Sequence, residues 1–509
     1  MKSKCIILAV ALVSSVPGVR AEVKLPAIFG DNMVLQQGVV APVWGKADPG
    51  EKVTVSVAGQ SVSAVADAAG KWKLKLQPLK VVGAPLTVTV KGKNLITLTN
   101  VLVGEVWVGS GQSNMQYSLN GVLNGSQEVA AANYPTLRLF TVKTAAWRDP
   151  LDELEGAWVE CSPQTAKGFS ATLYLFGRDL QKELRQPVGL IHSSWGATII
   201  QSWTRWEVLM TDPDTKKEAE NRIRQLDDPA WLVHNYIEET AKRKAAAEKA
   251  IAEGKKPGPL QADWLGDGYR NRPASLYNAM IHPILGFPIR GVVWYQGEFN
   301  AGNAAQYERL FPKMIQDWRE QWGQGDFPFL FVQLPNNGPA VQTLPPEAKY
   351  DAEKWAALRE AQLKTLKVPN TGMAVTIDTS DGDLHPKNKQ PVGDRLARLA
   401  LKMAYGKQIA CSGPTLEKMS TQGNTVRLQF QHAEGGLVAK DNAQGFAIAG
   451  ADKKFVWGDA RIEGDCVLVS SAQVLEPVAV RYGWGNNPLV SLYNQAGLPA
   501  SPFRTDDWK

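Results

Sequence analysis

The first part of the chain alternates apolar and polar residues in the way that predicts β-strands. Alternation is clear in KVTVSVAG (52–59), SVSAVAD (61–67), KWKLKLQPL (71–79) and LTVTVKG (86–92). A period of two is that of a strand with one buried face. Turn-forming segments such as DPGE and DAAGK separate these runs. The pattern predicts a sandwich-like β module over residues 22–100.

From residue 101 the pattern changes to short apolar runs separated by amphipathic runs with helical spacing. The apolar runs are VLVGEVWV (101–108), VGLIHS (188–193), RGVVWY (290–295), FPFLFVQL (327–334) and GMAVTID (372–378). The helical runs are ATLYLFGRDLQKEL (171–184), SLYNAMIHPIL (275–285), AQYERLFPKMIQDWREQW (305–322), KWAALREAQLKTL (354–366) and VGDRLARLALKMA (392–404). Strands that alternate with helices predict an α/β domain over residues 101–405, with a parallel sheet covered by helices on both faces.

A longer and more charged segment, residues 206–272, interrupts this pattern. Its runs TKKEAENRIRQL and ETAKRKAAAEKAIAEGKK predict solvated helices of mixed charge. We interpret the segment as an insertion that forms a lid or wall near a site. After residue 405 strand-like alternation returns in NTVRLQF, GFAIAG, CVLVSS and PVAVRYGW. Residues 406–509 are therefore predicted to form a C-terminal β-rich region.

The N-terminal segment has the features of a secretory signal peptide. Lys2 and Lys4 precede an apolar run from Cys5 to Val13, and Val19–Ala21 forms a small-residue cleavage site. We expect residues 1–21 to be removed and the mature protein to be periplasmic or secreted. No later apolar run is long enough to span a bilayer, so no membrane association is predicted for the mature chain.

Charge and cysteine content argue against several classes of protein. The formal net charge of +6 over 509 residues is small, so no nucleic-acid partner is expected. Cys161, Cys411 and Cys466 remain after signal removal. They allow one disulfide, Cys411–Cys466, or stay as free thiols. No C-x-x-C or H-E-x-x-H spacing indicates a metal site, and no cofactor is predicted.

Small and polar residues follow four of the predicted strands of the α/β domain. Ligands bind beyond the carboxyl ends of parallel strands, where the connecting loops converge. The four loops are GSGQSNM with Ser113, SSWGAT with Gly196, QGEFN with Gln296, and TSDGDLHPKN with His385. They offer a hydroxyl, backbone donors, amides, carboxylates and an imidazole, which are the groups that acyl transfer through a serine requires.

Ser113 is the candidate nucleophile and His385 the candidate general base. Glycines shortly before Ser113 let the backbone turn sharply, although a serine after a strand is also a common helix N-cap. His385 is the one histidine of five that follows a strand in a polar loop, and His192, at a strand end, is the second candidate. The acid that orients the imidazole is predicted to be Asp383, with Asp381 as the alternative.

Oxyanion donors and substrate contacts complete the predicted site. The backbone N–H groups of Ser113 and Gly196 are candidate oxyanion donors, together with the side-chain amide of Gln296 or Asn300. Asn300 is also a candidate helix cap. Side chains predicted to contact the substrate are Asn114, Trp195 and Glu298, and Glu298 is further expected to brace its own loop.

The four loops resemble sequence blocks of a known family. GQSNM, SSWGAT, WYQGEFN and DLHPKNKQPVG, in this order, are similar to those of bacterial sialate O-acetylesterase-like carbohydrate esterases of the SGNH/GDSL hydrolase superfamily. The segments LPAIFGDNMVLQQGVVAPVWGKADPGEKVTV and NNPLVSLYNQAGLPASPFRTDDW resemble the flanking regions of that family, so the resemblance covers nearly all of the mature chain. It implies an SGNH-type, flavodoxin-like parallel sheet flanked by β-rich modules.

The resemblance also implies a metal-free serine esterase that releases acetate from acetylated sugars. It assigns Ser113 as nucleophile, His385 as general base and acid, and Gly196 as an oxyanion donor. Relatives that carry the QGE block use its glutamine, which favours Gln296 over Asn300.

This chain departs from the family pattern at two positions. In the superfamily the usual acid stands three residues before the histidine, where this chain has Gly382. A second glycine that the family often has is Ala197 here, which is expected to narrow the pocket slightly.

Several substrates and two other functions follow from the same residues. The family implies an O-acetylated sialic acid, with acetylated xylan or xyloglucan fragments as the alternative. A non-catalytic carbohydrate-binding protein on a decayed hydrolase core is a third hypothesis, but both Ser113 and His385 are present. A lipase or thioesterase is a fourth, and the polar QGEFN and DGDLHP loops argue against its broad apolar slot.

Overall fold

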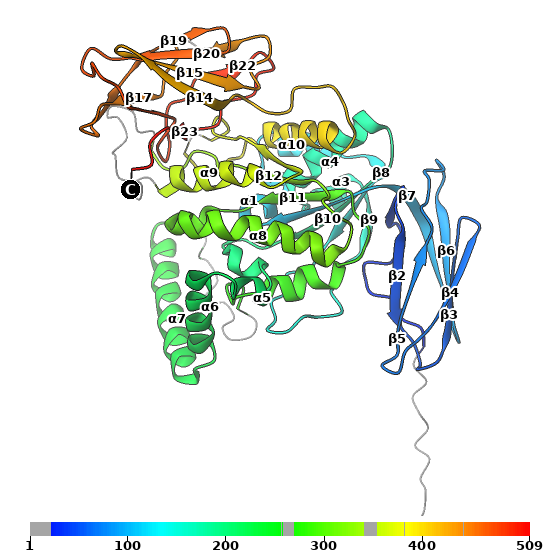
Figure 1. The fold of residues 1–509 in the computed structure, drawn as a ribbon. Coiled ribbons are helices and arrows are strands. Elements are labelled where there is room, and N and C mark those ends of the chain that lie inside the picture. Colours follow the sequence, from blue (N-terminus) through cyan, green and yellow to red (C-terminus); the bar gives the residue numbers. More distant parts are fainter. Residues whose placement is uncertain are drawn as a thin grey trace, which may run out of the picture.

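The computed structural model of the protein describes residues 22–255, 257, 269–339, 354–380, 382–440 and 442–508. The predicted signal peptide lies outside the described residues. Figure 1 shows a β-rich N-terminal part, a central sheet with helices, and a β-rich C-terminal part. No described helix combines the length and the apolar character that crossing a membrane would require.

The four alternating stretches of the N-terminal part all form strands. β3 (Lys52–Val57) lies between β4 (Gln60–Val65) and β6 (Leu86–Lys91) in one antiparallel arrangement. β2 (Ala41–Lys46) pairs with β5 (Lys71–Leu76). Residues of β5 alternate between exposed and buried along the whole strand, as its sequence period requires. The predicted strands of this region are confirmed.

One long strand, β7 (Leu95–Gly111), connects the N-terminal strands to the central sheet. Its first residues pair antiparallel with β6, and from Leu102 it pairs in parallel with β1 (Val34–Gln36) and then with the central strands. Every residue of β7 from Val101 onward is buried. A continuous hydrophobic core therefore runs from the N-terminal strands into the central part, across the boundary predicted at residue 100.

The central sheet has the strand order β13-β12-β11-β7-β10-β8-β9. Neighbouring strands are parallel, except that β9 runs antiparallel to β8. Their bounds are β8 (Tyr134–Thr141), β9 (Trp158–Cys161), β10 (Val188–Ser194), β11 (Gly291–Tyr295), β12 (Phe329–Val332) and β13 (Thr371–Ala374). The five predicted strands are confirmed. The sequence pattern does not indicate β8 and β9, because Arg138 interrupts the apolar run of β8 and β9 has only four residues.

Helices cover both faces of this sheet, as predicted (Figure 1). The main ones are α4 (Ala171–Leu184), α8 (Ala304–Trp322), α9 (Lys354–Lys364) and α10 (Gln390–Met403). α4 and α10 pack together on one face, where Phe176 contacts Trp107 of β7. α8 lies on the other face, where Trp318 contacts Trp294 of β11, and α9 packs beside α8.

The connections contain short helical turns. They are α1 (Ser113–Gln116), α2 (Gly125–Ala131), α3 (Pro163–Ala166) and α5 (Trp206–Leu209). The helix predicted over residues 275–285 is instead a π-helical turn, Tyr277–Ile281, followed by a 3-10 turn, His282–Ile284. Pro283 accounts for the change, because proline lacks the backbone N–H that a regular helix would use there.

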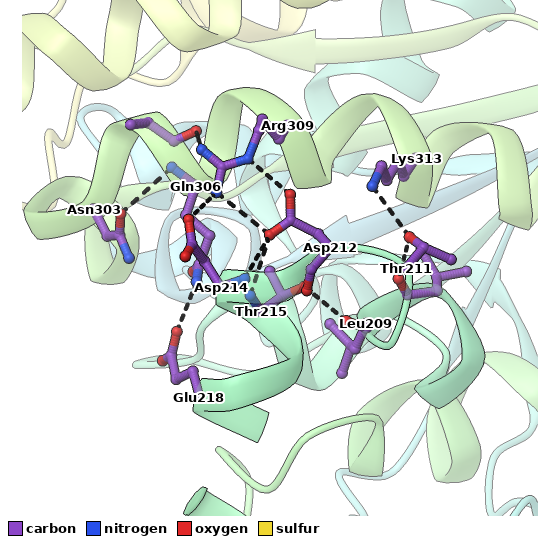
Figure 2. Close-up of polar contacts among 12 residues, drawn as sticks. Leu209, Thr211, Asp212, Asp214, Thr215, Glu218, Asn303, Gln306, Arg309 and Lys313 are labelled. Carbon is purple, nitrogen blue, oxygen red and sulfur yellow. Dashed lines mark hydrogen bonds and ion pairs between the residues drawn. The ribbon is translucent and has the colours of Figure 1, made fainter. Parts of the chain in front are cut away.

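The charged insertion forms two adjacent helices, α6 (Pro213–Leu226) and α7 (Pro229–Ala252), beside α8 (Figure 1), which confirms its helical character. Asp212 caps α6, because its Oδ1 accepts the backbone N–H groups of the first turn. The same carboxylate accepts a hydrogen bond of 2.8 Å from Arg309 of α8 (Figure 2). The hydrogen bond from Arg309 is the main cause that lowers the pKa of Asp212 to about 2.

The C-terminal part has a second hydrophobic core. One sheet consists of β14 (Thr415–Gln422), β15 (Thr425–Gln431), β20 (Cys466–Ser470) and β19 (Asp459–Glu463). Another consists of β18 (Phe455–Trp457), β17 (Phe446–Ala449), β21 (Ala479–Tyr482) and β23 (Phe503–Arg504), and β16 (Leu437–Ala439) pairs with β22 (Leu492–Asn494). The three cysteines are free, so the proposed Cys411–Cys466 disulfide is wrong and the free-thiol alternative is confirmed.

We predict that Asp212→Ala loosens the α6–α7 insertion. The substitution removes both the cap of α6 and its ion pair to α8, which together are expected to cost about 1–2 kcal/mol of local stability. Limited proteolysis at neutral pH should then cleave within α6 and α7 several times faster. The matched control is Asp214→Ala, because Asp214 also pairs with Arg309 but its side chain is 74% exposed. Equal cleavage rates for the two variants would contradict the anchoring role of Asp212.

Candidate active site

The register of the central sheet brings three predicted loops to one point. Gly111, the last residue of β7, lies opposite Ser194 of β10 on one side and Tyr295 of β11 on the other. The loops after these strands therefore leave the sheet at the same level. After β7 the chain continues to β8 and β10 on one side of β7, and it later crosses to β11, β12 and β13 on the other side. The end of β7 is therefore a topological switch point.

Ser113 and His385 meet at this point. His385 Nε2 lies 2.9 Å from Ser113 Oγ, although 272 residues separate them in the chain. The sharp exit from β7 requires Gly111, whose φ is +133° and whose Cβ would lie 2.1 Å from the carbonyl oxygen of Tyr295. Both Ser113 and His385 are half-buried, so a ligand can reach them.

The surroundings of His385 favour its neutral form. Burial is the main cause that lowers the pKa of His385, and the nearby Lys389 lowers it further, while Asp383 acts in the opposite direction. The ring of Tyr117 stacks on the imidazole with centroids 6.0 Å apart. A neutral imidazole beside a hydroxyl is the state that a general base needs.

The predicted acid holds the backbone of the histidine loop rather than the imidazole. Asp383 is exposed, and its Oδ1 accepts the backbone N–H of His385 at 2.9 Å. Among the described residues, His385 Nδ1 has no hydrogen-bond partner. The alternative acid, Asp381, lies outside the described residues. Asp383 therefore acts on the imidazole ring through its charge and not through a hydrogen bond.

The two amides predicted as oxyanion donors have their N–H groups bound to other residues than Ser113. Gln296 Nε2 donates to the carbonyl oxygen of Thr198 and to Asn300 Oδ1, at 3.0 and 2.7 Å. Asn300 Nδ2 donates to Gln201 Oε1, and both Gln296 and Asn300 are buried. These amides belong to a hydrogen-bonded layer behind the site. Sequence reasoning places them in the correct loop but does not fix the direction of their N–H groups.

Gln116, which the sequence analysis does not single out, borders the nucleophile. Its Oε1 accepts the backbone N–H of Gly196 at 2.8 Å. A Cβ on Gly196 would lie 3.2 Å from Ser113 Cβ, which places the Gly196 backbone directly beside the nucleophile. The Nε2 of Gln116 makes no hydrogen bond to the described chain. Gln116 is thus a side-chain amide in direct contact with Gly196, one of the predicted oxyanion donors.

Asn114 and Glu298, predicted to contact substrate, instead form a buried bridge between loops. Asn114 Nδ2 donates to Glu298 Oε1 at 2.6 Å and to the carbonyl oxygen of Leu384 at 3.0 Å. Asn114 Oδ1 accepts a hydrogen bond of 2.5 Å from Lys389 Nζ. Asn114 is fully buried and Glu298 nearly so, so neither is available to a sugar. Glu298 does brace its loop, as expected.

Lys389 is the second residue that the sequence analysis misses. Its side chain is 1% exposed, and its Nζ lies over the rings of Tyr295 and Tyr117 at 5.2 and 5.9 Å. Burial lowers the pKa of Lys389 to about 7, against the attraction of Glu298 and Asp383. A lysine in the polar run HPKNKQPVG is normally solvated, so the sequence carries no signal for this burial.

Trp195 and His192 occupy different surroundings. Trp195 is half-buried next to Gly196, with the guanidinium of Arg270 5.9 Å above its ring, so it remains a candidate substrate contact. His192 is buried in β10, and its Nε2 pairs with Ser194 Oγ at 2.6 Å. Burial lowers the pKa of His192 to about 4. His192 therefore does not serve Ser113.

Comparisons with known proteins agree with this geometry. A family model described as carbohydrate esterase, sialic acid-specific acetylesterase, matches residues 258–402. The sialate O-acetylesterase of Mus musculus is 32% identical, over 94% of this chain and 93% of its own, and that of Rattus norvegicus is 31% identical with the same coverage. The structure of a carbohydrate acetylesterase from Xanthomonas citri has 36% identity and a TM-score of 0.79, over 96% of this chain and 100% of its own.

A largely parallel sheet covered on both faces, with the predicted site loops at the switch point, defines an SGNH-type hydrolase fold. The similarity to the relatives extends over almost the whole chain. The chain belongs to the sialate O-acetylesterase family, and it is thus a carboxylic ester hydrolase. The relatives are named as esterases, which argues against the hypothesis of a non-catalytic protein on a decayed core.

We predict that Lys389→Met shifts the acid limb of the pH–activity profile to higher pH. A cation disfavours protonation of His385, so its removal raises the pKa of His385 and delays the appearance of the neutral imidazole as pH rises. The variant also leaves Asn114 Oδ1 without its donor, for which we expect about a tenfold loss in kcat/KM.

The pH dependence of kcat/KM for acetyl ester hydrolysis measures this shift. Lys387→Met is the matched control, because Lys387 is exposed and its side chain has no hydrogen bond or ion pair to the described residues. The control should keep the acid limb of the unmodified enzyme. Superimposable profiles for Lys389→Met and the unmodified enzyme would remove the electrostatic role of Lys389.

Proposed function

We propose that the protein is an exported serine esterase that removes O-acetyl groups from acetylated sugars through an acetyl-serine intermediate. The observation that carries this proposal is the 2.9 Å contact between His385 Nε2 and Ser113 Oγ in an accessible site. Family membership supports the ester-hydrolysing reaction. The signal-peptide features of the N-terminal segment support the exported location.

In the first half of the reaction Ser113 attacks the acetyl carbonyl. His385 Nε2 takes the proton of the hydroxyl as the new bond from Ser113 Oγ to the carbonyl carbon forms. The resulting oxyanion needs preset donors, for which the backbone N–H groups of Ser113 and Gly196 are proposed. Gln116 Oε1 now accepts the Gly196 N–H, so the substrate carbonyl oxygen has to replace it there. The sugar alcohol then leaves with the proton that His385 holds.

In the second half water releases acetate. His385 takes a proton from a water molecule as that water attacks the carbonyl carbon of the acetyl-serine. The same donors hold the oxyanion that forms, and Ser113 Oγ then leaves with the proton from His385. Asp383 is proposed as the acid of the site, because its charge opposes the lowering of the His385 pKa and so favours the imidazolium that forms in each half. Its hydrogen bond to the backbone of His385 also holds the loop in place.

Ser113→Ala is predicted to reduce turnover of an activated acetyl ester by about 10⁴-fold or more, because it removes the nucleophile. The thermal unfolding midpoint should stay close to that of the unmodified enzyme, since Ser113 is half-buried and its side chain bonds only His385 in the described chain. Ser118→Ala, a half-buried serine that bonds Asn120, is the matched control and should retain turnover. Near-normal hydrolysis by Ser113→Ala would refute the serine mechanism.

Sialic acid O-acetyl esters are the first proposed substrates, because the mouse and rat relatives, which match 94% of this chain, are named as sialate O-acetylesterases. Acetylated xylan or xyloglucan oligosaccharides are the second, because a bacterial relative with 36% identity is named only as a carbohydrate acetylesterase. Both classes present an acetyl ester on a sugar hydroxyl, so the same chemistry serves either.

Acetate release from O-acetylated sialosides, acetylated xylan oligosaccharides and acetylated xyloglucan oligosaccharides distinguishes the two classes. We expect kcat/KM to be at least about tenfold higher for the sialosides, which corresponds to about 1.4 kcal/mol of transition-state discrimination. The Ser113→Ala variant supplies the background rate for each substrate. A tenfold higher kcat/KM for either plant oligosaccharide would instead identify plant polysaccharide as the substrate class.

A further inference from the structure

The C-terminal module contains a polar cleft that shares no residue with the candidate active site. Its volume is about 470 Å³, within the size range of small-molecule sites. Three segments form its walls: residues 442–446, which lead into β17, residues 457–460, where β18 passes to β19, and Leu489. The backbone N–H of Gly458 donates to the carbonyl oxygen of Phe446 at 3.0 Å, which joins the first two walls.

The loop that forms the third wall is held in close contact with the first. A Cβ on Gly445, which has a φ of +90°, would lie 2.4 Å from the carbonyl oxygen of Leu489. Only glycine fits such a conformation and such an approach. The cleft is therefore a built feature of the module rather than a gap between loose loops.

The side chains in the cleft combine one aromatic face with unpaired polar groups. Trp457 is 37% exposed, although tryptophan is rarely left in solvent without a partner. The side chains of Asn442, Gln444 and Asp459 are exposed, and none makes a hydrogen bond or ion pair to the described chain. They supply amide donors and both amide and carboxylate acceptors at the rim of an aromatic surface.

These groups match the surface of a neutral sugar. A pyranose ring presents an apolar C–H face, which packs on an indole ring, and an edge of hydroxyl groups that both donate and accept. Among the described residues that line the cleft, Asp459 alone is charged, and none is a lysine, arginine or histidine. An anionic sugar would find no counter-charge there and would be repelled by Asp459.

We propose that this cleft is an accessory binding site for a neutral sugar chain, with Trp457 stacked on a pyranose ring and the three polar side chains bound to its hydroxyl groups. The site is separate from the esterase chemistry and does not depend on the serine mechanism. It would hold the unacetylated part of a glycan while an acetyl group is removed elsewhere.

Short contacts connect the cleft to the histidine loop. Asn487, two residues before Leu489, donates through Nδ2 to the carbonyl oxygen of Gly338 at 2.6 Å. The backbone N–H of Gly338 donates to the carbonyl oxygen of Gly382 at 2.8 Å, and Gly382 lies three residues before His385. This path consists of two hydrogen bonds and two short chain segments, which together span about 18 Å at full extension.

Isothermal titration of the full chain with unacetylated xyloglucan and xylan oligosaccharides tests the proposal. At least one of these neutral ligands should bind the unmodified protein, and Trp457→Ala should weaken that affinity at least tenfold. Trp457→Tyr, which retains an aromatic face, should keep most of the affinity. The matched control is Trp147→Ala, because Trp147 is 43% exposed and lies outside the cleft.

Two further comparisons make the outcome decisive. Ser113→Ala should bind the neutral oligosaccharides as the unmodified protein does, so loss of esterase activity and loss of sugar binding are separable. Sialyllactose should not show a Trp457-dependent affinity above that of its neutral lactose part. Equal affinities of the unmodified protein and Trp457→Ala, or no binding of any neutral oligosaccharide, would overturn the proposal, as would a cleft that prefers the sialylated ligand.

Discussion

The catalytic arrangement depends on one buried side chain, Asn114, which ties three loops together. Asn114 directly follows Ser113 in the chain. Its side-chain amide contacts Glu298 from the β11 loop and both Leu384 and Lys389 from the histidine loop. A buried charge lowers the stability of the folded state unless hydrogen bonds satisfy it. Removal of one partner would leave the remaining buried groups unsatisfied. The network therefore has one favourable arrangement, and in that arrangement Ser113 and His385 are within hydrogen-bonding distance.

The same network sets the electrostatics of the site. Lys389 is placed where its charge opposes protonation of His385, and Glu298, which shares Asn114 as a partner, favours the charged lysine. Burial raises the pKa of Glu298 and lowers that of Lys389, so the two groups lie far closer in pKa than in water. The same residues thus position Ser113 and His385 and set the charge around them. This double role explains why buried polar groups lie here, although an apolar core would be less costly in free energy.

Sequence alone predicts those features that local pattern determines. Helix α4 coincides with its predicted span, and Ser113 and His385 lie together as expected, because each follows a strand at the carboxyl end of a parallel sheet. The direction of a side-chain amide is different, because it depends on partners elsewhere in the chain. The amide of Gln296 donates to Thr198 and Asn300, and Lys389 is buried with its Nζ over the rings of two tyrosines. Neither arrangement leaves a local signal in the sequence.

The flanking β parts differ in how they support the site. The N-terminal strands share the central core through β7, so they stabilise the strand from which Ser113 emerges. The C-terminal module has its own core but is joined by polar contacts: the buried Arg359 of α9 donates to the carbonyl oxygens of Gly485 and Asn486. The next residue, Asn487, contacts the segment that supports the histidine loop. These contacts couple the position of the C-terminal module to the histidine loop, and a misplacement of about 1 Å in a catalytic group can cost about 100-fold in rate.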